Sequence, residues 1–291
     1  MACDCCGSTT WLPLFTENGV RLGQCPDCDL LSIDDIPAPE RRMTEMEAGH
    51  YAGSQEIVGA SKQSASERIL ADRFRGYVDL ARRHVDGGAW LDIGCGAGLL
   101  MGLAQEAGYT AEGIELSADR LATARRLTGA PVHGVPVEDV GYPDASFDVI
   151  SMINVFSHLI SPTQTFTELA RILRPGGVVV MVTGEMTAGV EQGDMLHWSL
   201  GDHLYFLGDR TMDRYAAKIG LEVVHHSRRW LPDEMFSREW LRMKGRSRAK
   251  NAVKTTVRFT PGGLAALRAV MLRRQADSSA HTSEFVLRVP A

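Results

Sequence analysis

The feature that most constrains the fold is the segment WLDIGCGAG at residues 90–98. Its apolar run ends in an acid, Asp92, and continues into glycines at every second position, Gly94, Gly96 and Gly98. An apolar strand that enters a glycine-rich turn before a helix is typical of the first unit of an open parallel sheet. Such sheets bind ligands at the carboxyl ends of their strands, so we expect this turn to hold a ligand.

Strand and helix patterns alternate after this turn. The predicted strands lie at residues 90–93, 111–114, 131–135, 147–153, 178–182, 221–225 and 283–290. Apolar residues at helical spacing over residues 61–85 predict a long amphipathic helix before the first strand, which we interpret as core packing. The alternation predicts an α/β fold, a doubly wound, seven-stranded, mostly parallel sheet with helices on both faces.

Domain boundaries follow from prolines and from composition. Pro37 and Pro39 interrupt regular structure, so residues 1–40 are expected to form a small unit and residues 41–85 a helical linker or lid. The main domain is then expected over residues 86–291, with a helical insertion at about 232–280 before the last strand.

Cysteine spacing predicts a metal site in the first unit. Cys3 and Cys6 form one C-x2-C pair, Cys25 and Cys28 form another, and eighteen residues separate the pairs. Four thiolates around Zn²⁺ stabilise a ribbon too small to fold unaided, so we expect a structural zinc ribbon. Cys5 could replace Cys3 or Cys6, although the glycine after Cys6 favours Cys6. A disulfide pair or loose surface thiols are the alternatives.

Charge and hydropathy restrict the partners. The formal net charge is −5, but residues 228–280 carry thirteen Lys or Arg against four acids. This basic stretch is either a solvated face or a binding surface. The ribbon is acidic, with one cation against six acids between residues 3 and 35, which disfavours nucleic acid as a partner. With neither a membrane span nor a secretory signal in the pattern, we expect a cytoplasmic protein.

The glycine spacing distinguishes among ligands. A dinucleotide turn has the pattern G-x-G-x-x-G, whereas this turn has G-x-G-x-G with Asp92 two residues ahead. That carboxylate would repel a phosphate and attract a cationic group. Glu115, at the end of the second predicted strand, is placed to accept two hydrogen bonds from a ribose diol.

Four segments together resemble a known family. WLDIGCGAG, AEGIELS, FDVISMINVFSHLISP and ELARILRPGGVVVMVT, in this order, resemble the class I S-adenosylmethionine-dependent methyltransferases. With its cysteine pairs, the chain is similar to zinc-ribbon members of that superfamily. These include antibiotic-pathway sugar C-methyltransferases, O-methyltransferases like those of the ubiquinone pathway, and some ribosomal RNA guanine methyltransferases.

The resemblance implies the cofactor S-adenosyl-L-methionine and a set of residues that bind it. The implied residues are Asp92, Gly94, Cys95, Gly96, Gly98, Glu115, Leu116, Val137, Glu138 and Asn154. Relatives commonly carry an aspartate for the adenine amino group about where this chain has Pro136. Glu138 or water is expected to take that role.

Three residues are candidates for acceptor chemistry. His203, in the loop after the fifth strand, is our first candidate for a general base that deprotonates a hydroxyl. The rival role for His203 is to cap a helix or order its loop. His158 is the second candidate or a structural histidine of its turn, and Tyr51 could close the pocket. A reaction without any base, driven by proximity alone, is also open.

The leading hypothesis is methyl transfer to a hydroxyl of a small molecule in secondary or glycan metabolism, with the acceptor free or tethered to a carrier. The alternatives are RNA base methylation, C- or N-methylation of a small molecule, and a non-catalytic cofactor-binding partner protein. The sequence does not determine the oligomeric state. Steep salt dependence of RNA binding would identify the RNA enzyme.

Overall fold

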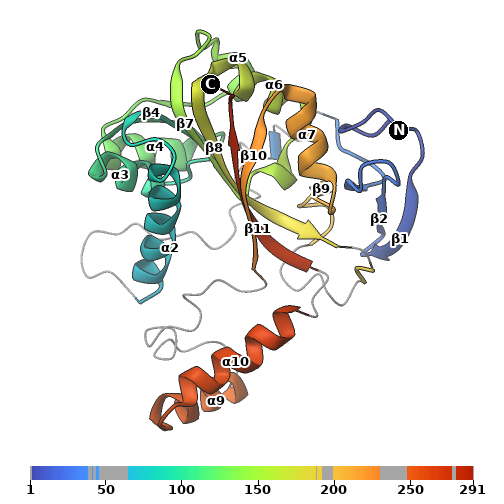
Figure 1. The fold of residues 1–291 in the computed structure, drawn as a ribbon, viewed down its shortest axis with the longest axis vertical. Coiled ribbons are helices and arrows are strands. Elements are labelled where there is room, and N and C mark those ends of the chain that lie inside the picture. The colour runs from blue at the N-terminus through green and yellow to red at the C-terminus, as the bar shows by residue number, and fades with distance from the viewer. Residues whose placement is uncertain are drawn as a thin grey trace.

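A computed structural model of the chain contains two sheets (Figure 1). It describes residues 2–38, 41, 44–45, 65–187, 189–191, 199–229, 248–276 and 280–290. The larger sheet lies at the centre between two layers of helices, and the smaller one stands beside it at the N-terminal end of the chain.

The larger sheet has seven strands in the order β10-β11-β8-β7-β4-β5-β6. The strands are β4 (Gly88–Ile93), β5 (Tyr109–Ile114), β6 (Val132–His133), β7 (Phe147–Ile153), β8 (Leu173–Met186), β10 (Glu222–Arg229) and β11 (Ala280–Arg288). Strand β11 is antiparallel to both neighbours, whereas the pairs from β8 through β6 are parallel. The predicted doubly wound, mostly parallel sheet is therefore confirmed.

Most of the observed strands differ in length from the predicted ones, and two of these differences have a clear cause. The strand expected at residues 131–135 is reduced to β6, because Pro136 stands at the N-cap of the next helix and ends the extended run. Strand β8 is longer than predicted, because its buried residues extend to Met186 and pair with β11 along their whole length.

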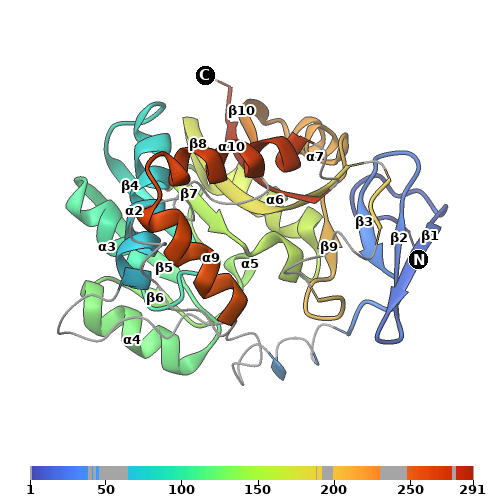
Figure 2. The ribbon, with the colours of Figure 1, turned by 90° about the horizontal axis from the view of Figure 1, so that it is seen from below.

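Helices cover both faces of this sheet (Figures 1 and 2). They are α2 (Ala65–Arg82), α3 (Leu99–Glu106), α4 (Ala118–Thr128), α5 (Val137–Val140), the 3-10 turn η1 (Phe156–His158), α6 (Pro162–Ile172) and α7 (Thr211–Ile219). Buried residues of α2, α3 and α4 share one core with the sheet, and those of α5, α6 and α7 share the other. The apolar face predicted for α2 is buried at Tyr77, Val78 and Ala81.

The smaller sheet has four strands in the order β1-β2-β3-β9. Three come from the cysteine-rich segment, β1 (Leu12–Glu17), β2 (Val20–Gln24) and β3 (Leu31–Ile33), and the fourth is β9 (Tyr205–Phe206). Its buried side chains, including Leu22 and Leu31, belong to the same core as α6 and α7. The ribbon thus packs on the main domain through a continuous apolar core.

The predicted insertion contains a pair of helices, α9 (Arg248–Phe259) and α10 (Gly263–Ala276), between β10 and β11. Figure 1 shows this pair standing apart from the two sheets. Within the described residues, we find no helix with the length and apolar character needed to cross a bilayer.

Candidate active site

A cavity of about 310 Å³ lies at the carboxyl ends of β4, β5 and β7. The strand order reverses here, because β5 and β6 extend the sheet to one side of β4, whereas β7 and β8 extend it to the other. Open parallel sheets bind ligands at this position. The cavity is therefore the candidate active site.

The turn after β4 and the end of β5 are joined by Glu115. The turn is left-handed at Gly94, Gly96 and Gly98, with φ angles of 68°, 57° and 87°. The main-chain N–H of Gly96 donates to Glu115 Oε2 at 2.9 Å, and that of Ser117 donates to Oε1 at 2.8 Å. Each carboxylate oxygen has more than one lone pair. Glu115 is therefore fixed by main-chain donors and retains acceptor capacity for a diol.

Asp92 lies in the cavity wall and is only 3% exposed. The hydroxyl of Ser151 donates to its Oδ1 at 2.6 Å. Burial, together with the nearby charge of Glu115, raises the pKa of Asp92 to about 7, against the opposing effect of the Ser151 bond. A cationic group in the cavity would favour the ionised form, so the site suits a positively charged ligand.

The far end of the cavity is formed by the start of α5. Pro136, Val137 and Glu138 line it there, and Thr165 of α6 donates its hydroxyl to Glu138 Oε1. The Glu138 side chain is thereby oriented beside the segment where the sequence places the adenine ring.

The cavity brings together most residues singled out from the sequence. Its lining includes Asp92, Gly94, Cys95, Gly96, Glu115, Leu116, Val137, Glu138, Asn154 and His158. Gly98 does not belong to the lining; a Cβ there would lie 2.8 Å from Thr128 Cγ2, so this glycine allows α3 to pack against α4. Tyr51 lies outside the described residues.

His158 and His203 form a pair beside the cavity, with ring centroids 4.8 Å apart. His158 Nδ1 lies 2.8 Å from the carbonyl oxygen of Asp202, and His203 Nδ1 lies 3.1 Å from that of Ser199. A carbonyl can only accept, so in each neutral ring Nδ1 carries the proton and Nε2 carries the lone pair. His158 lines the cavity, whereas His203 does not.

Sequence reasoning missed several lining residues. Phe74 of α2, Arg120 of α4 and Leu159 after η1 also line the cavity. The helical pattern of residues 61–85 assigned Phe74 to the core. Periodicity does not indicate that this side chain also lines the cavity at the carboxyl ends of the strands. Leu159 could have been predicted, because it is adjacent in sequence to the candidate His158.

The four predicted metal ligands lie together in the ribbon. The sulfur atoms of Cys3, Cys6, Cys25 and Cys28 are all within 4.8 Å of one another. The Cys3–Cys28 and Cys6–Cys25 sulfur pairs are 3.5 and 3.6 Å apart, close to the spacing of about 3.8 Å that a tetrahedral zinc site with Zn–S bonds of about 2.3 Å requires. Cys5 points elsewhere, with its thiol 3.9 Å from the carbonyl of Thr211.

Comparison with known proteins gives the family. Residues 66–226 match the family described as "Methyltransferase domain", over the region that runs from α2 to β10 and contains the cavity. The chain belongs to this family. It is a class I S-adenosylmethionine-dependent methyltransferase, which confirms the resemblance in its sequence.

Two curated relatives of this methyltransferase are both ubiquinone biosynthesis O-methyltransferases. It is 30% identical over 178 residues to the ubiquinone biosynthesis O-methyltransferase of Azoarcus sp. (strain BH72), an alignment covering 54% of this chain and 71% of the relative. It is 29% identical over 161 residues to that of Agrobacterium fabrum (strain C58 / ATCC 33970), covering 50% of this chain and 64% of the relative.

A solved structure supports the fold. The methyltransferase superposes on geranyl diphosphate C-methyltransferase from Streptomyces coelicolor A3(2) with a TM-score of 0.60 at 15% identity, covering 87% of this chain and 99% of that one. An identity this low shows the fold alone.

The cavity residues of the methyltransferase fit its cofactor. The carboxylate oxygens of Glu115 can accept hydrogen bonds from a diol, and the buried carboxyl group of Asp92 can pair with a cation. The glycines between them bring the main chain to the cavity wall without side chains.

Proposed function

We propose that the protein transfers the methyl group of S-adenosyl-L-methionine to a hydroxyl oxygen of a small organic acceptor, with His158 as the general base. The observation that carries this proposal is the position of His158, in the wall of the cofactor cavity with its Nδ1 donating to the Asp202 carbonyl. This hydrogen bond leaves the lone pair on Nε2, the form that a general base requires.

The cofactor-binding residues would act by orientation. Glu115 would hold the ribose, Asp92 the cationic methionine end, and the segment at Val137 the adenine ring. S-adenosyl-L-methionine, when bound, supplies a methyl group already activated on a sulfonium, so the protein mainly has to align the two reactants and exclude water.

His158 would take the hydroxyl proton at Nε2 while the acceptor oxygen bonds to the methyl carbon, whose bond to the sulfonium would break and leave a neutral thioether. The Asp202 carbonyl would then stabilise the resulting imidazolium through its bond to Nδ1. A positioned base of this kind accelerates transfer by about a hundred- to ten-thousand-fold.

His203, the first candidate from sequence, is proposed as the supporting member of the pair. It stacks between the His158 ring and Phe206, with centroids 4.8 and 5.8 Å away, and its Nδ1 is held by Ser199. His203 thus packs against the ring of the proposed base, which limits rotation of the His158 ring.

The names of two relatives support our choice of acceptor class. The two relatives described above are named for O-methylation in ubiquinone biosynthesis, so we take a hydroxyl group on an aromatic ring as the first choice of acceptor. A hydroxyl of a secondary metabolite or of a sugar, free or carrier-bound, is the second choice.

The four thiolates of the ribbon are proposed to hold a structural Zn²⁺. The sulfur spacing fits a tetrahedral site, and four protein ligands occupy all the positions of such a site. The ion would therefore stabilise the ribbon and take no part in methyl transfer.

A product screen tests the proposal. The protein would be incubated with S-adenosyl-L-methionine and separate panels of catechols, hydroquinones, sugar nucleotides and an RNA transcript, and analysed by mass spectrometry. A gain of one CH2 unit on oxygen in a small-molecule panel supports the proposal. Methylated RNA, or methyl on carbon or nitrogen only, overturns it.

A further inference from the structure

The cysteine-rich ribbon, residues 2–36, contacts one chain segment that follows His158 and another that follows His203 and β9. Its first knuckle carries Cys3 and Cys6 and its second carries Cys25 and Cys28. The first reaches the segment that follows His158, and the second reaches the segment that follows β9.

The first knuckle acts through Asp4, which stands between its two thiols. The Asp4 carboxylate accepts the main-chain N–H of Thr163 at 2.8 Å, the hydroxyl of Ser161 at 3.0 Å and the hydroxyl of Tyr215 at 2.7 Å. Ser161 is the N-cap of α6, three residues after His158. The first knuckle therefore fixes where the His158 turn ends.

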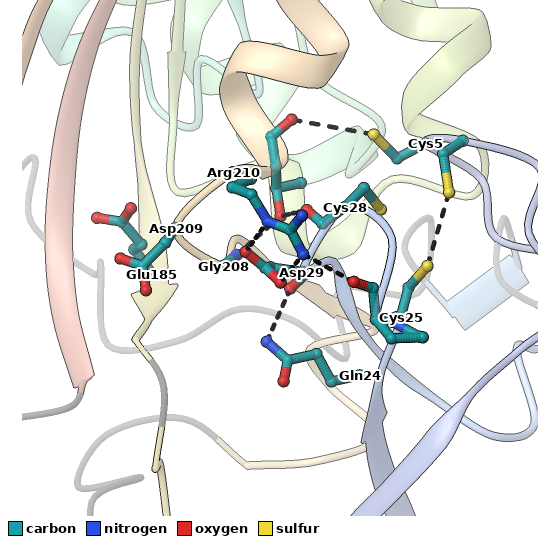
Figure 3. Close-up of polar contacts among 12 residues, drawn as sticks. Cys5, Gln24, Cys25, Cys28, Asp29, Glu185, Gly208, Asp209 and Arg210 are labelled. Atoms are coloured by element: carbon teal, nitrogen blue, oxygen red, sulfur yellow. Dashed lines mark hydrogen bonds and ion pairs between the residues drawn. The ribbon is translucent and has the colours of Figure 1, made fainter.

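The second knuckle acts through Cys28 and the residue after it (Figure 3). The guanidinium of Arg210 donates to both oxygens of Asp29, each at 2.8 Å. The hydroxyl of Thr211, which is fully buried, donates to the carbonyl of Cys28 at 2.9 Å and accepts the N–H of Gly208 at 2.9 Å.

The approach at this turn is close. A Cβ on Gly208 would lie 2.2 Å from the main-chain oxygen of Asp29, so only glycine fits there. The thiol of Cys5, from the first knuckle, meets the carbonyl of Thr211 at 3.9 Å. Both knuckles thus contact Thr211, at the start of α7.

Main-chain bonds link the ribbon to both histidine segments. The N–H of Ile33 donates to the carbonyl of Leu204 at 3.1 Å, and the N–H of Leu204 donates to the carbonyl of Ser157 at 2.7 Å. Leu204 follows His203, and Ser157 precedes His158. A single path of hydrogen bonds therefore runs from the ribbon through one histidine segment to the other.

The cofactor residues are held differently. The bonds to Glu115 come from Gly96 and Ser117, and the bond to Asp92 comes from Ser151. These partners lie on β7 or in the turns that follow β4 and β5, so the sheet itself maintains Asp92 and Glu115, whereas Glu138 is bonded to Thr165 of α6.

We propose that the metal-loaded ribbon is a clamp that positions the His158–His203 pair, with Thr211 and Asp4 as its positioning residues, and that it leaves cofactor binding unaffected. The effect of the clamp on catalysis rests on the proposed role of His158. Its effect on the two histidine segments can be measured without an acceptor substrate. Metal occupancy would then control the acceptor side of the site alone.

A matched pair of variants tests the clamp. Thr211→Val removes the hydroxyl at nearly constant volume, whereas Thr211→Ser keeps it. Metal content, amide hydrogen exchange by mass spectrometry and calorimetric affinity for S-adenosyl-L-methionine would be measured in both. In Thr211→Val we expect exchange in residues 156–163 and 199–207 to be about tenfold faster, with metal content and cofactor affinity unchanged. Thr211→Ser should behave as wild type.

Metal removal gives an independent test. Treatment of the wild-type protein with a chelator should accelerate exchange in the same two segments and leave exchange in β4 and β5 and the cofactor affinity within about twofold. Unchanged exchange in both segments, or equal acceleration throughout the large sheet, overturns the clamp. A failure of wild-type protein to bind S-adenosyl-L-methionine would count against the proposed function instead.

Discussion

Gly96 and Glu115 are joined by a hydrogen bond of 2.9 Å from the main-chain N–H to the carboxylate. The bond ties the turn after β4 to the end of β5 before any ligand arrives. The carboxylate is consequently oriented toward the cavity without help from the cofactor, which lowers the entropy cost of binding.

Glu115→Gln should weaken the binding of S-adenosyl-L-methionine by about 10- to 100-fold, because hydrogen bonds to a charged group contribute about 1.5–3 kcal/mol. Titration calorimetry measures this loss. Glu112→Gln is the control, since Glu112 lies on β5 away from the cavity lining and pairs with His133. Equal affinities of wild type and Glu115→Gln would remove Glu115 from the ribose site.

The pKa of Asp92 predicts a pH dependence of cofactor affinity. Burial raises this pKa to about 7, and a bound cation favours the ionised carboxylate. Affinity for S-adenosyl-L-methionine should therefore be about tenfold lower at pH 6 than at pH 8, and Asp92→Asn should abolish the difference. A flat profile in the wild type would contradict the contact.

Without ligand, the raised pKa of Asp92 gives the stability of the fold a pH dependence opposite to that of cofactor affinity. The neutral form is favoured in the folded state, so the contribution of Asp92 is fully present below its ordinary pKa and is lost as the pH rises to about 7. Thermal unfolding measures this effect. As the pH rises to about 7, the wild type should lose stability relative to Asp92→Asn.

His158→Gln should slow methyl transfer by about a hundred- to ten-thousand-fold while cofactor affinity stays constant. His203→Gln should have a smaller effect, because His203 does not line the cavity. Steady-state rates with an acceptor from the screen, beside calorimetry, separate the two. A larger loss of methyl-transfer rate in His203→Gln than in His158→Gln would make His203 the base and His158 the supporting residue.

The ion pair between the buried carboxylate of Glu185 and the exposed side chain of Arg228 predicts an acid-sensitive stability. Burial alone would raise the pKa of Glu185, but hydrogen bonds from Arg228, His226 and Ser283 outweigh it and hold the pKa at about 2. The ion pair therefore stabilises the fold above about pH 4.5, and its contribution is lost as the pH falls toward 2.

Arg228→Met should consequently lower the free energy of unfolding at pH 7 by about 1.5–3 kcal/mol, because it removes the charged donor to buried Glu185 and leaves this carboxylate only its bonds to His226 and Ser283. Denaturant unfolding measures the change. Arg21→Met, which breaks the exposed pair with Asp34, is the control and should cost less than about 1 kcal/mol. Equal effects of the two variants would contradict this account.

Local sequence predicted which residues lie together at one end of the cavity. Asp92, Gly96 and Glu115 lie within one strand–turn–helix–strand unit, where short spacing fixes geometry. The cysteine cluster was predictable for the same reason, because each knuckle is a four-residue turn.

The acceptor side depends on contacts that spacing cannot reveal. Asp29 and Arg210 are 181 residues apart in the chain, and Asp4 and Tyr215 are 211 apart. The position of His158 rather than His203 in the cavity wall follows from how η1 and β9 pack, which no local pattern encodes. Gly98 is the converse case, since this glycine of the turn does not line the cavity and instead allows α3 to pack against α4.

Transfer of an isotopically labelled methyl group tests the central claim most directly. The protein would receive S-adenosyl-L-methionine with a ¹³C-methyl group and a phenolic acceptor from the screen, and NMR would locate the label. We predict a label on oxygen for the wild type and a rate at least about a hundredfold lower for His158→Gln. A label on carbon or nitrogen, or a wild-type rate in His158→Gln, would contradict the account.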